Sequence, residues 1–313
     1  MATRDTSVRG AQPGSRLRAS GRRWSDDGVK VFFAICAVIS IVTTIGIVVA
    51  LLEPAIEFFQ EINFIDFITG TRWAPLFEPP SFGVVPLLAG TFSITIWASV
   101  VCIPFGLGAA IYMSEYAPAR VRKVIKPILE VLAGIPTVVF GYFALLLVTP
   151  LLKDIGLDIT GAFNALSAGL VVGVMVLPTV ASLSEDAMSA VPMDLRSGAY
   201  ALGGTRLKVS TRVVVPAAIS GIIASFVLAV SRIVGETMIV LIAAGQQPTL
   251  SLDPLKPVET MTAFIGATGQ GDVPTGSTEY KTIFAVGLTL FVLTFVMNIV
   301  AIQLVRRYRE VYE

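Results

Sequence analysis

Apolar residues occur in long runs along most of the chain. Six runs are long enough to cross a membrane, because a helix needs roughly 20 apolar residues to span a hydrocarbon core of about 30 Å. They cover about 31–52, 84–111, 127–151, 165–183, 217–244 and 282–304. Prolines such as Pro136 interrupt the third and fourth runs, and membrane helices tolerate internal proline where neighbours satisfy the freed carbonyls. The pattern predicts an all-α polytopic membrane protein with six transmembrane helices.

The polar segments between these runs differ in charge. With the N-terminus placed inside, 18 of the 23 Lys and Arg residues fall in inner segments and four in outer ones. Such a bias sets the orientation of membrane proteins. We therefore predict a multi-pass protein of a bacterial plasma membrane with both termini in the cytoplasm. Residues 1–30 form a basic cytoplasmic tail, suited to setting orientation and binding anionic lipids, and residues 31–313 form the transmembrane domain.

Two outer loops are sizeable, 53–83 and 245–281, and both are acidic and rich in Pro and Gly. This composition is typical of exposed connectors with partial structure. They serve either as docking surfaces for an external protein or as solvated connections. Trp73 and Phe77 in the first loop are predicted to be membrane-interface anchors.

Composition narrows the chemistry. The chain is 54% hydrophobic and 14% charged, against about 25% charged for a typical soluble domain. It has no histidine, and Cys36 and Cys102 both lie in apolar runs, so we expect packing roles for the cysteines and no metal site. No G-x-x-x-x-G-K-[ST] motif occurs, so any ATP is bound by another subunit. We predict no cofactor and no enzymatic activity on this chain.

The inner segment at about 184–216 has local structure of its own. Pro192 stands near a helix start, the pair Gly203 and Gly204 ends that helix, and Thr205 is suited to cap a second one. Pro216 then opens the next span. The result is an L-shaped pair of short helices at the inner membrane face, which another protein can grip.

The spacing in this segment resembles the EAA loop of ABC-importer permeases. That pattern has Glu-Ala-Ala, three residues, Gly, nine residues, a β-branched or aliphatic residue, any residue, an aliphatic residue and Pro. The chain departs from it at the front, where Ser and Gly replace the Glu and the first Ala. The resemblance implies an ATPase-coupling loop that contains Ser197, Gly198, Ala199, Gly203, Gly204, Val213, Val215 and Pro216.

Five further stretches resemble the PstC-type permease family of phosphate ABC importers: "FITGTRWAP", "LAGTFSITIWA", "IYMSEYAP", "GIPTVVFGYFAL" and "SRIVGETM". The resemblance implies the ABC-importer permease (MetI-like) core and a role in ATP-driven phosphate import. It also implies partners: a PstA-type second permease, a PstB-type ATPase dimer and an extracytoplasmic phosphate-binding protein, besides membrane lipids and without nucleic acid. The alternatives are a permease for another oxyanion, a stand-alone secondary anion transporter, and a membrane sensor or scaffold.

Two full charges, Arg232 and Glu236, lie inside the fifth run. Each costs about 2.5–3.5 kcal/mol at a helix centre, so such charges usually face a bundle interior or a water-filled path. Their spacing places them on one helix face. Three interpretations stay open: Arg232 steers phosphate while Glu236 holds its guanidinium, the pair gates the pathway against the second permease, or it is a structural ion pair.

Overall fold

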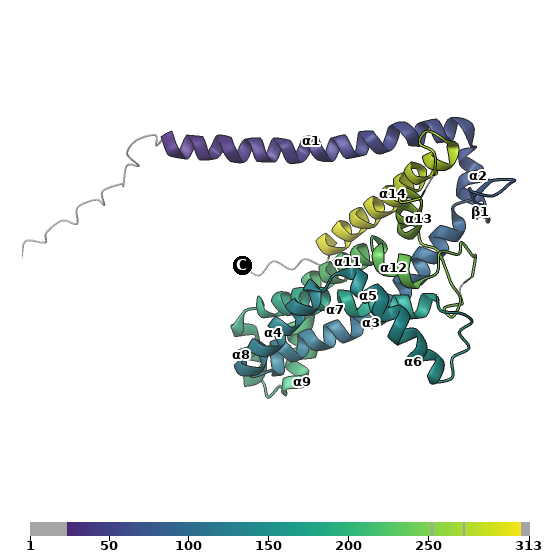
Figure 1. Cartoon of the computed structure of the whole chain (residues 1–313). Coiled ribbons are helices and arrows are strands. Elements are labelled where there is room, and N and C mark those ends of the chain that lie inside the picture. The colour runs from purple at the N-terminus through teal and green to yellow at the C-terminus, as the bar shows by residue number, and fades with distance from the viewer. Residues whose placement is uncertain (1–23, 252, 272, 308–313) are drawn as a thin grey trace, which may run out of the picture. The chain divides into compact units, whose positions relative to one another are not determined.

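The structure is a computed structural model that describes residues 24–251, 253–271 and 273–307. The described part of the chain is mostly helical (Figure 1). Two short strands, β1 (Trp73–Ala74) and β2 (Ser81–Phe82), pair antiparallel with Trp73 opposite Phe82. Most of the predicted basic tail lies outside the described residues, so its division from the rest at residue 30 stays a prediction.

The helices differ widely in length. In chain order they are α1 (Trp24–Glu61), α2 (Phe64–Thr69), α3 (Val85–Ile111), α4 (Ala119–Gly134), α5 (Thr137–Phe143), α6 (Thr149–Asp154), α7 (Ala165–Ser189), α8 (Met193–Ala201), α9 (Arg206–Val209), α10 (Val215–Ala217), α11 (Ile219–Val234), α12 (Met238–Ala243), α13 (Met261–Gly269) and α14 (Thr278–Arg307). Wider π-helical turns continue three of them: η1 (Tyr112–Tyr116), η2 (Ala144–Val148) and η3 (Ser210–Val214). Such turns are rare in proteins overall, but those that occur are often found at functional sites.

The number of membrane spans agrees with the prediction. Among the described residues, five helical stretches are long and apolar enough to cross a membrane. A sixth arises if Arg206–Ala217 and Ile219–Val234, bent by 71°, count as one span. The third span starts later than predicted, at Thr137 instead of about 127. The physical reason is Pro136, which holds Ile135 in an extended conformation and separates the polar helix α4 from α5.

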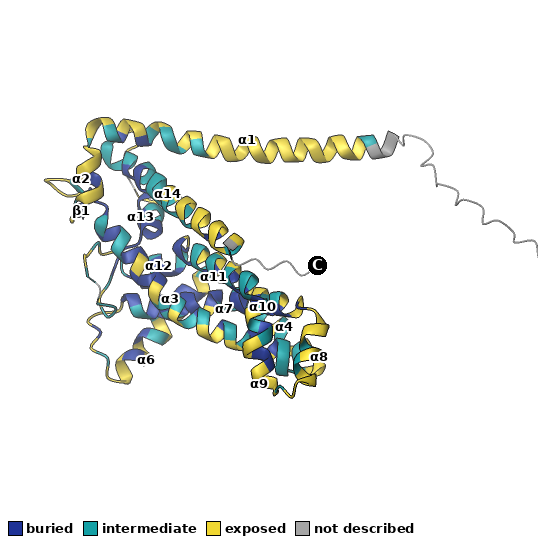
Figure 2. Ribbon diagram, turned by 180° about the vertical axis from the view of Figure 1, so that it is seen from behind, coloured by how far each residue is buried: buried dark blue, intermediate teal, exposed yellow. Residues whose placement is uncertain are grey.

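The chain divides into two compact units, Met1–Ala50 and Leu51–Glu313. In the described part of the first unit, α1 exposes apolar side chains around its circumference, among them Phe32, Phe33 and Ile45 (Figure 2). A helix that is apolar all round suits lipid on every side.

In the second unit α3 and α7 pack along one another, and α11 packs against both (Figure 1). Small residues permit this close approach: a Cβ on Gly173 would lie 2.7 Å from the Ala98 carbonyl oxygen. Glycine and alanine at helix crossings are typical of membrane bundles. Buried residues accordingly concentrate in α3 and α7 (Figure 2).

A second core lies at the opposite end of this unit from α8. It contains Phe58, Phe67, Trp73, Met261 and Phe264, with Trp73 and Phe264 in edge contact at 4.9 Å. Trp73 is only 3% exposed, so its prediction as an interface anchor is wrong, because aromatic neighbours from α2 and α13 enclose it. Phe77 is 69% exposed.

Candidate functional site

The fifth span is broken in the middle of "SRIVGETM". Helix α11 ends at Val234 with Gly235 as its C-cap, and α12 starts at Met238. Glycine weakens a helix interior, and the Glu236 side chain offers the following amides a different acceptor. Arg232 therefore lies on α11 whereas Glu236 lies in the break. The expectation that the two share one helix face is wrong, because the helix does not continue through residues 235–237.

Glu236 is buried, with 8% of its surface exposed. Its carboxylate Oε1 accepts the backbone amides of Met238 at 3.1 Å and Ile239 at 3.2 Å. These are amides of the first turn of α12, which have no partner inside the helix. The Glu236 backbone carbonyl in turn accepts the hydroxyl of Thr262 at 2.6 Å. Glu236 thus caps α12 and joins the break to α13.

Arg232 is exposed, and its Nη1 donates to the hydroxyl of Thr179 on α7 at 3.2 Å. The ion pairs found in the described part of the chain involve other residues. A neutral hydroxyl orients the guanidinium without neutralising it. The positive charge of Arg232 therefore stays available to an anion. A carboxylate partner would neutralise that charge and weaken its attraction for an anion.

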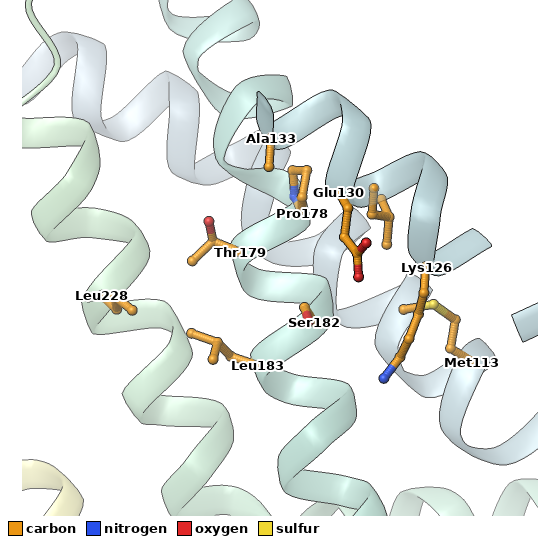
Figure 3. A pocket seen from close by; sticks show the side chains of 10 residues that line it. Met113, Lys126, Glu130, Ala133, Pro178, Thr179, Ser182, Leu183 and Leu228 are labelled. Carbon is orange, nitrogen blue, oxygen red and sulfur yellow. The ribbon is translucent and has the colours of Figure 1, made fainter. Parts of the chain in front are cut away.

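Thr179 borders a cavity of about 350 Å³ between α4, α7 and α11 (Figure 3). Lys126, Glu130 and Ser182 supply further polar groups to its wall, and the other lining side chains are mostly apolar. The lining residues are Met113, Lys126, Leu129, Glu130, Ala133, Pro178, Thr179, Ser182, Leu183 and Leu228. Through its hydrogen bond to Thr179, Arg232 is therefore next to a residue that borders this cavity.

The inner loop has the predicted shape. Helix α8 starts after Pro192, and Gly203 adopts φ +79° after it. The Thr205 hydroxyl then accepts the amide of Lys208 and caps α9. Through η3 and α10 the chain reaches α11, with Pro216 inside α10. The sequence positions of the EAA-like pattern therefore fall on α8, the glycine turn and η3 to α10. Their role in coupling stays a prediction.

Charged residues that the sequence reasoning did not single out meet near α8. Glu185, near the end of α7, is 1% exposed and pairs with Lys126 at 2.5 Å and Arg122 at 3.7 Å. Glu115 in η1 pairs with Arg196 in α8 at 3.1 Å. The available sequence signal was two acidic residues beside inner segments rich in Arg and Lys, but their partners lie far along the chain.

The segment before α13 crosses α3 closely. A Cβ on Gly90 would lie 2.1 Å from the Glu259 carbonyl oxygen, so only glycine fits there. The Met261 amide donates to the Thr91 hydroxyl at 3.1 Å. Burial raises the pKa of Glu259 to about 7. This contact links the N-terminal half of α3 to α13, whose Thr262 donates to the Glu236 carbonyl.

The described residues contain no group of three or more His, Cys, Asp or Glu side chains placed to hold a metal ion. The sequence-based expectation of no metal site stays a prediction for the whole chain.

Comparison with known proteins agrees with this architecture. The model of the family "Binding-protein-dependent transport system inner membrane component" matches residues 103–310, more than half of the chain. The "Probable ABC transporter permease protein YqgH" of Bacillus subtilis is 35% identical over 83% of this chain and 84% of its own length. The "Phosphate transport system permease protein PstC" of Mesorhizobium japonicum is 29% identical over 87% of each.

Among solved structures, a bacterial alginate ABC transporter in complex with an alginate-bound periplasmic protein contains a similar chain. Its TM-score is 0.63 at 19% identity, over 92% of this chain and 98% of that one. At this identity the likeness concerns the fold, which is that of ABC importer permeases. With the family match and the helical membrane fold, the chain therefore belongs to the family of inner membrane components of binding-protein-dependent transport systems, as a permease subunit of an ABC importer.

Proposed function

We propose that this permease imports inorganic phosphate and that Arg232 is the cation that phosphate meets inside the membrane. The observation that carries the proposal is the state of Arg232: exposed, held by the Thr179 hydroxyl, and not paired with Glu236. Planar guanidinium donors match phosphate oxygens. Relatives named as phosphate transport permeases support this substrate.

The hydrogen bonds of Glu236 to backbone amides, and not to Arg232, support one of the three earlier interpretations. It favours steering of the anion by Arg232, while Glu236 shapes the break in the span. A structural ion pair between the two is not supported, because the carboxylate of Glu236 is engaged at the start of α12. The second permease subunit would supply the facing wall of the pathway.

The partners follow from the importer mechanism. A PstA-type permease completes the pathway, a PstB-type ATPase dimer grips α8 and the glycine turn, and an extracytoplasmic phosphate-binding protein delivers the ion to the outer loops. Closure of the ATPases moves α8, and α9 to α10 pass the movement to α11, which carries Arg232. Transport requires no reaction on this chain.

The test is uptake of radiolabelled phosphate into liposomes that contain the complete transporter and its binding protein. Arg232→Gln should lower uptake about 10- to 100-fold, the value of one lost hydrogen bond to a charged group, while the complex still assembles. Arg232→Lys keeps the charge and should retain part of the uptake. Normal uptake by Arg232→Gln would overturn the role of Arg232. Preferred uptake of arsenate, sulfate or molybdate would assign another oxyanion.

The orientation is part of the proposal: both termini and the α8 turn face the cytoplasm. Leu202 at this turn is 91% exposed and offers a position for labelling. In a chain without Cys36 and Cys102, Leu202→Cys should react with a membrane-impermeant maleimide only after the cytoplasmic face is opened. Labelling from the outside of intact cells would reverse the assigned orientation.

A further inference from the structure

Few side chains attach helix α8 to the rest of the protein. None of its residues is buried, and Met193 is 69% and Tyr200 42% exposed. Only Arg196 and Ala199 reach intermediate burial in this helix. A helix of this length is marginal in water unless packing supports it. The attachment of α8 therefore depends on very few side chains.

Arg196 makes that attachment. Its Nη2 donates to the Glu115 carboxylate at 3.1 Å and to the Met188 carbonyl at 2.8 Å, and its Nη1 donates to the Val191 carbonyl at 3.1 Å. The Arg196 side chain is 12% exposed and that of Glu115 6%. One guanidinium thus joins α8 to the C-terminal end of α7 and to η1, the continuation of α3. These two helices form the central pair of the bundle.

The receiving end is braced as well. Arg122 donates through Nε to the Met113 carbonyl at 3.0 Å and through Nη2 to the Ser114 carbonyl at 3.1 Å, so the end of η1 is held on α4. The Ser114 hydroxyl also donates to Glu115 Oε1 at 3.2 Å. These bonds hold the Glu115 carboxylate in place. A displacement of α8 therefore acts, through Arg196, on a group that is fixed to the bundle.

We propose that Arg196 is the positioning residue that transmits movement of α8 to the transmembrane bundle through Glu115. The proposal rests on the proposed function, since it assumes that an ATPase moves α8. The charge that Arg196 carries faces inward, so α8 is held from the bundle side.

The experiment measures phosphate transported per ATP hydrolysed by the complete transporter in liposomes, together with stimulation of ATP hydrolysis by the binding protein. Glu115→Gln and Arg196→Gln should each lower the transport ratio at least tenfold in complexes that contain the ATPase. Lys123→Gln removes one exposed cation from α4, near the same end of the bundle, and should leave the ratio unchanged.

The double variant Glu115→Gln/Arg196→Gln separates coupling from stability. Each single change leaves a charge that is at most 12% exposed without its partner, which destabilises a protein, whereas the double change removes both charges. We expect the double variant to recover assembly and ATP hydrolysis and to keep the low ratio. A ratio like that of the wild type in the double variant, or in either assembled single variant, would overturn the proposal.

Failure of the proposed function gives a different result. If the unmodified transporter hydrolyses ATP in response to its binding protein but moves no phosphate, the substrate is wrong. Stimulation of ATP hydrolysis by the binding protein still tests the link in that case. A loss of this stimulation in Arg196→Gln with normal ATPase binding supports it, and unchanged stimulation contradicts it.

Discussion

Replacing Glu236 by leucine should open the first turn of α12, whereas replacing it by glutamine should not. Leucine fills similar space but offers no acceptor to the amides of Met238 and Ile239, which the carboxylate accepts at 3.1 and 3.2 Å. Glutamine keeps a side-chain oxygen at nearly the same place. The comparison therefore separates the capping role of Glu236 from its charge.

The magnitude follows from these two bonds. A lost cap costs about 0.5–2 kcal/mol, and a hydrogen bond to a charged group contributes about 1.5–3 kcal/mol. Because Glu236 is only 8% exposed, water does not easily replace the carboxylate, and we take about 2 kcal/mol for leucine. At 1.4 kcal/mol per factor of ten, this equals about a 30-fold change in the local opening equilibrium. Glu236→Gln removes only the interaction of the Glu236 charge with the helix dipole. That interaction contributes about 0.3–1 kcal/mol, which equals about a two- to fivefold change in the local opening equilibrium.

Hydrogen exchange of peptides that cover residues 234–243 measures this directly in the purified complex. Exchange in α12 should be about 30-fold faster for Glu236→Leu and at most about fivefold faster for Glu236→Gln. Phosphate uptake should follow the same order, because α12 continues the span that carries Arg232. If glutamine is as damaging as leucine, the negative charge itself is required and Glu236 acts on the substrate or on Arg232.

Three further predictions concern local backbone and burial. Gly203→Ala should destabilise the protein by about 1 kcal/mol, because alanine is strained at φ +79°. Gly198→Ala should stabilise the protein by a similar amount, because Gly198 lies inside α8, where alanine is preferred to glycine. Thermal unfolding of both variants distinguishes the two effects. Gly90→Ala should cost about 1–3 kcal/mol by the same assay, since its Cβ would lie 2.1 Å from the Glu259 carbonyl oxygen, and Gly108→Ala, with nothing within 4 Å, is the matched control that should show no loss. Burial raises the pKa of Glu259 from 4.5 to about 7, so the folded state holds a proton that the unfolded chain releases between these values. Stability should fall as pH rises from 4.5 to 7, and Glu259→Gln should remove this dependence; an unchanged slope in unfolding measured from pH 5 to 8 would refute it.

Much of the fold was predictable because its signals are local. Runs of about 20 apolar residues dictate spans in any sequence, and the inner loop contains its own punctuation in Pro192, Gly203 and Thr205. Each of these residues acts on amides or dihedral angles within four residues of itself. The predicted start of the third span is too early. Hydropathy averaged along the sequence hides the break at Pro136, where the backbone at Ile135 is extended and the helix ends.

The candidate site was predicted in part. Arg232 and Glu236 stand out in any apolar helix, so the sequence singles out the stretch "SRIVGETM" as a candidate site. It could not place the carboxylate, because a run of helix-compatible residues does not reveal that Gly235 ends α11. The acceptor role of Glu236 toward α12, and the hydroxyl of Thr262 on its carbonyl, exist only once α13 folds against the break.

By itself the sequence determined a helical protein with five or six membrane spans, an inner loop of two helices joined by a glycine turn, and charges in the fifth apolar run, because hydrophobic period and turn chemistry act over a few neighbouring residues. Only the tertiary structure decided which groups these charges bind. Arg196 donates to Glu115, 81 residues away in the sequence, and Arg232 donates to Thr179, 53 residues away. Those pairs form because small residues let α3, α7 and α11 pack closely. The charged residues to which we assign transport roles are therefore visible in the chain, but their partners are set by helix packing.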